Sequence, residues 1–442
     1  MSEKKPIMLP GSLVCYATFS YTASGVITVA HDNGVYIGSE INKLERVLLH
    51  RPGSELAKIT IDNKDELLID EIIWVERAAS DHEAFAALLR ENGVEVIYFQ
   101  DCLADIMEDL NLREAITNDA LSRETHDHNL KSVLKSLIME MNARQAAQLL
   151  VGGLTKREMK RLADGVRSLT FQTADDGDFF FRPLPNLYFQ RDPYFFVRNG
   201  VLLSSMKFLA RQREPMYAKY IFQNHEIFRG VRILFGDHEG DGYPHSIEGG
   251  DFLVLDEQCV AIGVSERSSA GTVQIIGSRL ASELGVKRIL AVDIPKQRAF
   301  MHLDTVFTMV DKDAFTIYPD ARNNMRIWDL EYGENGALNS ITEYSDLSEA
   351  LKRALFLDKI RFIETGGGDP VAASRDQWND GTNTLAISPG IVVSYECNSV
   401  SNKALRDNGI IVHEISGSEL GKGRGGPRCM SMPIKRQTRP PS

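Results

Sequence analysis

Along this chain, a short amphipathic helix followed at once by a strand is a recurring pattern. In the clearest copy, four apolar residues with helical spacing mark one face of the helix: Val273, Ile276, Leu280 and Leu284. Gly285 follows, and residues 286–290 then form an apolar and β-branched run. A glycine in this place is typical of a helix C-terminus, where the backbone adopts a positive φ. The pattern predicts a chain of the α/β class.

Five copies of this helix–strand junction are spread over the sequence. They cover residues 92–98, 229–235, 284–290, 358–363 and 408–413, and the copy at 358–363 lacks the glycine. Five such units are typical of a five-fold, propeller-like α/β repeat. An open sheet with alternating helices gives the same local signals. The pattern alone therefore favours neither architecture over the other.

The stretch from about Cys102 to Gln172 breaks this pattern, because it contains no strand signal. Apolar residues at helical spacing form a stripe: Leu130, Val133, Leu134, Leu137, Ile138 and Met141. Thr155 and Glu158 have the spacing of a capping box. We therefore expect an all-helical insertion over residues 102–175, followed by a loop at residues 175–178 that leads back to the main fold.

The first 35 residues are expected to form an N-terminal extension. From Gly11 to Ala30 the chain carries no charged residue, and two lysines precede this stretch, which weakly resembles a signal peptide. However, it is rich in Thr, Ser and Tyr and lacks a strong apolar block, so a peripheral extension is the favoured interpretation. The main α/β fold is then expected in two parts, residues 36–101 and 176–442, on either side of the insertion.

Composition narrows the classes of function. The chain has 442 residues and a net charge of −11, which argues against nucleic-acid binding and is compatible with a small cationic substrate. Its five cysteines are scattered and show no CxxC pairing, which argues against a disulfide framework or a zinc knuckle. Free thiols indicate a reducing compartment, so we expect a cytoplasmic protein. Nothing in the sequence approaches a membrane span.

A glycine- and arginine-rich segment near the C-terminus carries the strongest chemical signal. Residues 421–429 read Gly-Lys-Gly-Arg-Gly-Gly-Pro-Arg-Cys. The formal GxGxxG pattern is a poor dinucleotide site, because Pro427 follows at once and no helix opens. Cys429 stands close to Arg424 and Arg428, whose charges would favour a thiolate. A structural cysteine is the alternative, but the glycine and arginine context favours a nucleophile.

His302 and Asp304 form a second candidate. If they lie in a strand, residues two apart point to the same face and would act on one site. The pair is incomplete as a metal site, because no third ligand lies nearby in the sequence. An imidazole beside a carboxylate does suffice as an acid and base that activates a cysteine. A surface histidine is the alternative.

Two acidic motifs complete the candidates. Residues 247–251, Ile-Glu-Gly-Gly-Asp, are echoed by Glu-Thr-Gly-Gly-Gly-Asp at 364–369. Such motifs form turns in which the aspartate caps a backbone amide, and their repetition also fits an internal repeat. Arg191 and Asp192 precede Pro193 and are typical of a loop ion pair. Near a pocket, Asp192 could instead hold a guanidinium through two hydrogen bonds.

Taken together and in this order, these motifs resemble the arginine deiminase family. The resemblance runs from about Tyr36 to Arg436 and rests on residues 66–76, Asn186, Phe189, Arg191, Asp192, Ala210, Arg211, residues 248–251, Glu266, Arg267, His302, Asp304, Arg424 and residues 429–433. It implies the pentein fold, a five-bladed α/β propeller with a helical insertion after the first repeat. It also implies a hydrolase that converts free L-arginine into L-citrulline and ammonia without a metal or organic cofactor.

The resemblance implies a role for each catalytic side chain. Cys429 is the nucleophile that attacks the guanidinium carbon and forms a covalent S-alkylthiouronium. His302 protonates the departing ammonia and then activates the hydrolytic water. Asp192 and Asp304 hold the guanidinium nitrogens, and Glu248 supports both the guanidinium and the histidine.

Substrate-binding residues follow from the same resemblance. Arg211 and Arg267 pair with the substrate α-carboxylate, Asn186 and Phe189 line the pocket, and Arg424 belongs to a mobile glycine loop and exchanges partners when substrate enters. Agmatine lacks the α-carboxylate and would leave two buried arginines without a partner, so free arginine is favoured. The rivals are an agmatine deiminase, an arginine dihydrolase, a non-catalytic arginine sensor and a metallohydrolase. We also expect a homo-oligomer, a dimer or a tetramer, with no nucleic-acid or membrane partner.

Overall fold

The computed structural model describes residues 34–237, 241, 244–296 and 300–438, and the backbone of three earlier strands. These strands, β1 (Lys4–Ile7), β2 (Cys15–Tyr21) and β3 (Ile27–Ala30), form one antiparallel sheet. About half of residues 1–35 lies outside the described residues, so the expectation of a peripheral extension, and of a signal-peptide-like stretch within it, stays a prediction. Among the described residues, none of the helices is long and apolar enough to cross a bilayer.

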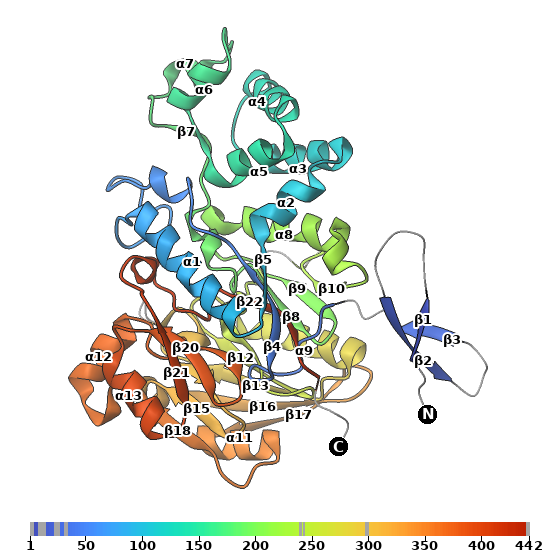
Figure 1. The fold of residues 1–442 in the computed structure, drawn as a ribbon, viewed down its shortest axis with the longest axis vertical. Helices are drawn as coiled ribbons and strands as arrows, with labels where there is room; N and C mark the ends of the chain where they lie inside the picture. Colours follow the sequence, from blue (N-terminus) through green and yellow to red (C-terminus); the bar gives the residue numbers. More distant parts are fainter. Residues whose placement is uncertain are drawn as a thin grey trace.

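One connectivity recurs five times in the part of the chain that the structure describes (Figure 1). In the unit after the helical insertion, β8 (Tyr194–Val197) pairs antiparallel with β9 (Gly200–Leu203). Helix α8 (Arg213–Asn224) then leads to β10 (Arg232–Phe235), which runs parallel to β9. Each unit is therefore a hairpin, a helix and a parallel third strand.

Three further units follow the same order along the chain. Their elements are β11 (Phe252–Val254), β12 (Cys259–Val264), α9 (Ala270–Leu284) and β13 (Arg288–Asp293); β14 (Phe307–Met309), β15 (Ala314–Ile317), α11 (Leu347–Leu355) and β18 (Arg361–Glu364); and β19 (Leu385–Ser388), β20 (Ile391–Tyr395), α13 (Ser399–Asp407) and β21 (Ile411–Ile415). Strands β16 (Arg326–Tyr332) and β17 (Leu338–Tyr344) extend the first of these three sheets on the far side of β13. The short helix α10 (Pro319–Arg322) follows β15 within its unit, and α12 (Pro370–Trp378) lies between β18 and β19.

The remaining unit joins the two ends of the described chain. Strand β22 (Met432–Arg436) pairs antiparallel with β4 (Leu44–Leu49), and helix α1 (Val75–Glu91) leads to β5 (Glu95–Tyr98), which is parallel to β4. Figure 1 shows β22 beside β4 within the main body. The last strand thus completes a sheet that the first strands of the main fold begin.

The five predicted helix–strand junctions are confirmed, because β5, β10, β13, β18 and β21 each begin within the predicted segment. Gly93, Gly230, Gly285 and Gly409 all adopt a positive φ, between 69° and 83°. In the copy without a glycine, Phe356 ends α11 with a φ of 54°. A left-handed residue at this position is thus a property of the repeat, and glycine is only its least strained occupant.

Helices dominate the segment between the first and second units. They are α2 (Phe99–Ile106), α3 (Leu110–Ser122), α4 (His128–Glu140), α5 (Ala143–Gly152), α6 (Lys156–Leu162) and α7 (Leu169–Thr173). The capping box at the start of α6 is confirmed, since the Glu158 amide donates to Thr155 Oγ1 and the Thr155 amide donates to Glu158 Oε2. The expectation that this segment holds no strand is wrong, because β6 (Leu154–Thr155) pairs with β7 (Phe179–Phe181). Two residues are too few to leave a periodic signal.

The helical segment and the adjoining strands share one hydrophobic core. The ring of Phe99 from α2 stacks on the ring of Tyr194 from β8, with centroids 6.2 Å apart, and Tyr194 also meets Phe222 from α8 edge to face. Fully burying a large apolar side chain contributes roughly 1.5–3 kcal/mol. The shared core therefore packs the helices against β8, which begins two residues after Asp192.

Candidate active site

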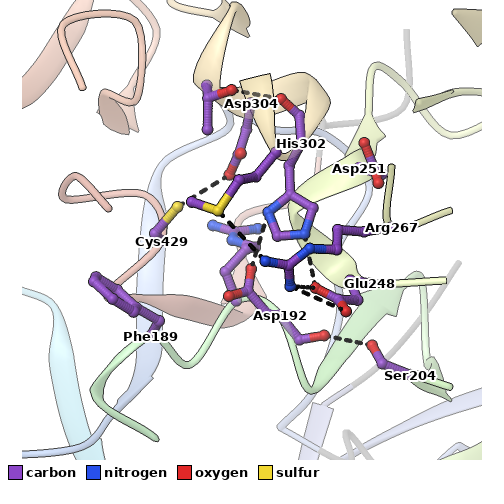
Figure 2. Close-up of polar contacts among 12 residues, drawn as sticks. Phe189, Asp192, Ser204, Glu248, Asp251, Arg267, His302, Asp304 and Cys429 are labelled. Carbon is purple, nitrogen blue, oxygen red and sulfur yellow. Dashed lines mark hydrogen bonds and ion pairs between the residues drawn. The ribbon is translucent and has the colours of Figure 1, made fainter. Parts of the chain in front are cut away.

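One cavity of about 240 Å³ brings together side chains from distant parts of the sequence. The predicted site residues that line it are Asn186, Phe189, Asp192, Arg211, Arg267, His302, Arg424 and Cys429. The other two predicted residues, Glu248 and Asp304, are fully buried behind it and contact His302 and Cys429. Figure 2 shows seven of these residues converging: Phe189, Asp192, Glu248, Arg267, His302, Asp304 and Cys429. All ten predicted site residues thus gather at one place.

Cys429 lies between the glycine-rich segment and β22, with its sulfur against a carboxylate. The sulfur is 3.5 Å from Asp304 Oδ2, and only 3% of the residue is exposed (Figure 2). Burial raises the pKa of this thiol well above its ordinary value, and the negative charges of Asp304, Asp192 and Asp380 raise it further. In the unliganded cavity the thiol is therefore protonated.

The positive charge expected around Cys429 does not dominate its surroundings, because both arginines have other partners. Arg428 lowers the pKa of the thiol, but its guanidinium is bound to Asp304 Oδ2 at 2.7 Å and to Glu40 Oε2 at 3.1 Å. The guanidinium carbon of Arg424 lies 3.6 Å from the ring centroid of Trp378. Arg428 thus favours the thiolate as predicted, but burial and the carboxylates of Asp304, Asp192 and Asp380 outweigh its effect on the pKa.

His302 is held between two carboxylates. Its Nε2 lies 2.9 Å from Glu248 Oε2, and its Nδ1 lies 3.7 Å from Asp192 Oδ1. Burial lowers the pKa of His302, but the carboxylates of Asp192, Glu248 and Asp251 outweigh it and raise the pKa to about 9. The imidazole is therefore a cation near neutral pH and can act as an acid.

The strand expected at His302 and Asp304 is replaced by a 3-10 turn, Leu303–Thr305, and β14 starts only at Phe307. The Leu303 amide donates to Asp251 Oδ1 at 2.8 Å, which removes it from any strand ladder. Asp251 also accepts hydrogen bonds of 2.6 Å from Ser265 and from Ser268. Asp251 therefore caps a backbone amide, but this amide is 52 positions away in the turn after His302 and is not the neighbouring amide that the motif predicts.

The glycines before Asp251 allow the imidazole to approach the backbone. A Cβ placed on Gly250 would lie 2.5 Å from His302 Nδ1, which no side chain could occupy. In the echoing motif, Asp369 caps the first turn of α12 by accepting from the amides of Val371 and Ala372. The two motifs thus share their capping role, and the first also brings Glu248 to His302.

Both predicted carboxylate-binding arginines contact acidic groups of the site. Arg211 Nη1 lies 2.5 Å from Asp192 Oδ2, and Glu214 Oε2 accepts from Arg211 Nη2 at 2.8 Å. Arg267 Nη1 lies 3.1 Å from Glu248 Oε2, and its guanidinium stacks over Phe208 with 4.6 Å to the ring centroid. Arg211 therefore pairs with two carboxylates of the protein, and Arg267 pairs with one.

Two carboxylate oxygens stay available for a cation. Asp192 Oδ1 and Asp304 Oδ1 are buried and accept no hydrogen bond from any described residue. A buried oxygen without a donor is unfavourable by roughly 1–3 kcal/mol, and more when it is charged. A ligand rich in N–H groups would satisfy both.

The pocket wall is formed by Asn186 and Phe189, which come from a 3-10 turn, Pro185–Tyr188, and the residue after it. Asn186 Nδ2 donates to Leu67 O at 2.7 Å, and Phe189 is buried. Arg424 has a φ of 68° and lies 3.9 Å from Asp70 Oδ2. The structure thus places these residues where the sequence predicted.

Three contributors were not predicted: Glu214, Asn383 and Trp378. Glu214 stands three residues after Arg211, a spacing that brings side chains together in a helical turn, and this signal could have been used. Asn383 Oδ1 accepts from the Cys429 amide at 2.9 Å, but the two residues are 46 positions apart and share no motif. Trp378 is also distant from its partner Arg424 in the sequence.

The fold and the site define an α/β protein with a thiol, an imidazole and paired carboxylates around one cavity. The arginine deiminase family model matches residues 65–436, and the chain belongs to this family. It is 42% identical to the arginine deiminase of Bacillus cytotoxicus over 409 residues, and 40% identical to that of Streptococcus pneumoniae over 406 residues. Each alignment covers 91% of this chain and 98% of the relative.

Solved structures with the same mixed α/β fold are more distant in sequence. The amidinotransferase SxtG of Microseira wollei, from the saxitoxin biosynthetic pathway, matches with a TM-score of 0.54 at 12% identity, over 92% of this chain and 99% of its own. The N-terminal domain of ArgZ, a cyanobacterial arginine dihydrolase, matches with a TM-score of 0.51 at 14% identity, over 88% of this chain and 97% of its own. At these identities the likeness concerns the fold alone.

Proposed function

We propose that this chain is an arginine deiminase, a hydrolase of linear amidines that converts free L-arginine and water into L-citrulline and ammonia. The observation that carries this proposal is the arrangement of Cys429, His302 and two carboxylate oxygens without hydrogen bonds around one buried cavity. The membership of the chain in the arginine deiminase family supports it. No metal or organic cofactor has a task in the steps below.

The cavity binds the planar guanidinium through Asp192 and Asp304. Their Oδ1 atoms accept N–H groups of the substrate, and two carboxylates on one cation fix its orientation. At the other end of the substrate, Arg211 and Arg267 pair with the α-carboxylate. Binding thus exchanges ion pairs within the protein for ion pairs with the substrate, so every buried charge keeps a partner.

The positive charge of the substrate favours deprotonation of the Cys429 thiol. Cys429 is a thiol in the empty cavity, and a guanidinium beside it offsets the surrounding carboxylates, so the thiol releases its proton to solvent. The thiolate sulfur then bonds to the guanidinium carbon. His302 donates its proton to the departing nitrogen, the C–N bond breaks, and ammonia departs. An S-alkylthiouronium stays bound to the sulfur of Cys429.

Hydrolysis reverses the role of His302. The neutral imidazole takes a proton from water, and the resulting hydroxide attacks the carbon bound to sulfur. The C–S bond breaks, and the electron pair returns to Cys429. The hydroxyl proton passes to the Cys429 thiolate as the carbonyl of citrulline forms, and the ammonia takes up the proton that the thiol had released to solvent. The enzyme returns to its starting state with arginine and water converted to citrulline and ammonium.

We also propose that the five units close into a five-bladed propeller around this cavity. Two observations support closure over an open sheet. Each unit has the same connectivity, and β22 from the end of the chain pairs with β4 from its beginning. In an open sheet, the first and last units would lie at opposite edges.

Incubating the purified chain with arginine in excess chelator and measuring the products tests the function. Citrulline and one ammonia per arginine are expected. Ornithine with two ammonia would make the chain a dihydrolase, and binding of arginine without product would make it a sensor. Loss of citrulline formation on chelation would indicate a metallohydrolase. A preference for agmatine over arginine would contradict the assigned roles of Arg211 and Arg267.

A further inference from the structure

Asn383 is a buried residue that touches two parts of the site and has no role in the chemistry described above. Its side chain is fully buried in the loop between α12 and β19. Its Oδ1 accepts from the Cys429 amide at 2.9 Å, and its Nδ2 donates to the backbone oxygen of Asp304 at 3.2 Å. One amide group therefore bridges the backbone of the nucleophile and the backbone of the residue beside its sulfur.

The glycine-rich segment packs directly on this residue. A Cβ on Gly426 would lie 2.7 Å from the backbone oxygen of Asn383 and 2.9 Å from its Oδ1. The backbone oxygen of Asn383 also accepts from the Arg428 amide at 3.3 Å. The approach of the cysteine loop to Asn383 thus requires glycine at position 426.

The loop that carries Asn383 is itself fastened to the turn after His302. Gln377 Nε2 donates to the backbone oxygen of Thr305 at 2.8 Å, and the hydroxyl of Thr382 donates to the same oxygen. Thr308 Oγ1 donates to the backbone oxygen of Thr382 at 2.6 Å. These hydrogen bonds hold the loop against the turn. Asn383, which lies in this loop, in turn holds the backbone of Cys429.

We propose that Asn383 is a positioning residue that fixes the sulfur of Cys429 relative to Asp304 and His302. The proposal rests on the proposed function of Cys429 as nucleophile. A displacement of about 1 Å at a reacting atom can reduce the rate roughly 100-fold. The guanidinium is instead held by side chains that Asn383 does not contact. Its loss should therefore reduce kcat far more than it changes KM.

The first test compares Asn383→Ala with a matched control. Asn402 is also fully buried, and its Nδ2 donates to Tyr395 O and to Glu414 Oε1, both at 3.0 Å, away from the cavity. In Asn383→Ala, kcat is expected to fall about 10- to 100-fold, with KM changed less than about three-fold. In Asn402→Ala, Tm should fall while kcat stays within about two-fold of wild type.

Unchanged kcat in Asn383→Ala, a rise in KM without a fall in kcat, or an equal fall of kcat in both variants would overturn the proposal. Citrulline formation by the wild-type chain is measured first. If the wild-type chain forms no citrulline, the proposed function is refuted. If it does, the kinetics of the variants test the role of Asn383.

A second variant, Asn383→Asp, covers the case in which the alanine variant does not fold. It keeps an acceptor for the Cys429 amide and adds a negative charge near the thiol, which disfavours the thiolate. The midpoint of the pH dependence of alkylation by iodoacetamide should therefore move to higher pH, while KM for arginine changes less than about three-fold. An unshifted midpoint together with wild-type kcat would overturn the proposal.

Discussion

In the unliganded cavity, the sulfur of Cys429 lies 3.5 Å from Oδ2 of Asp304, whose other oxygen accepts no hydrogen bond from the described residues. The nucleophile thus faces a carboxylate instead of a cation. Its negative charge is disfavoured until a guanidinium enters between the acidic groups. In the function that we propose, activation of the thiol therefore depends on the presence of the substrate.

The raised pKa of His302 predicts a pH-dependent stability. The pKa is about 9 in the folded chain and 6.5 ordinarily, so the contribution of His302 is fully present below pH 6.5 and is lost as pH rises to about 9. The upper limit is about 3 kcal/mol. The free energy of unfolding should fall over this window, and less steeply in His302→Gln. Identical slopes in urea titrations of the two proteins would contradict the ion pairing of His302.

Glu248→Gln should move the alkaline limb of activity to lower pH. The Glu248 carboxylate accepts from His302 Nε2 at 2.9 Å and raises the pKa of the imidazole. Without this charge, His302 loses its proton at a lower pH and less acid is available to protonate the departing ammonia. The pH profile of kcat/KM checks this. A lower kcat with an unmoved alkaline limb would show that Glu248 does not set the protonation of His302.

Arg267→Ala should raise KM for arginine and narrow the preference for arginine over agmatine. Removal of a charged partner from a buried pair typically costs 3–5 kcal/mol, so the selectivity should fall by at least about ten-fold. The ratio of the two kcat/KM values is the measurement. Arg353→Ala serves as control, since Arg353 is exposed and pairs with Glu331 outside the cavity. An unchanged ratio in Arg267→Ala would show that Arg267 does not contact the α-carboxylate.

Exchange of partners by Arg424 should be visible in tryptophan fluorescence. The Arg424 guanidinium stacks over Trp378 in the unliganded structure, and a move towards bound substrate would remove this contact. Arginine added to a Cys429→Ser variant should therefore change the emission, and Trp378→Phe in the same background should abolish the change. If binding measured by calorimetry leaves the emission unaltered, Arg424 keeps its partner.

Local signals in the sequence were sufficient to predict the helix–strand junction of the repeated unit. The helix ends at Gly93, Gly230, Gly285 and Gly409 and the cap at Thr155 depend on neighbouring residues, so each could be predicted. How the five units are arranged depends on contacts between distant strands, which periodicity does not contain. The oligomeric state likewise stays a prediction, and light scattering on the purified chain would test it.

The site was predicted as a set of residues but not as a network of charges. The turn at His302 exists because Asp251, 51 positions before it, captures the amide of Leu303. The effect of Arg428 on the thiol is outweighed, because burial and nearby carboxylates raise the thiol pKa, and the Arg428 guanidinium itself binds Asp304 and Glu40, which is 388 positions away. Tertiary ion pairs of this kind leave no trace in the spacing of a motif.

The most direct test of the central claim is the mass of the protein during turnover. Acid quenching within the first turnovers, followed by peptide mapping, should show the peptide of Cys429 heavier by the mass of arginine less that of ammonia. Cys429→Ser should bind arginine but form neither this adduct nor citrulline. An adduct on another residue, or citrulline formation by Cys429→Ser at a rate near that of the wild type, would contradict the account.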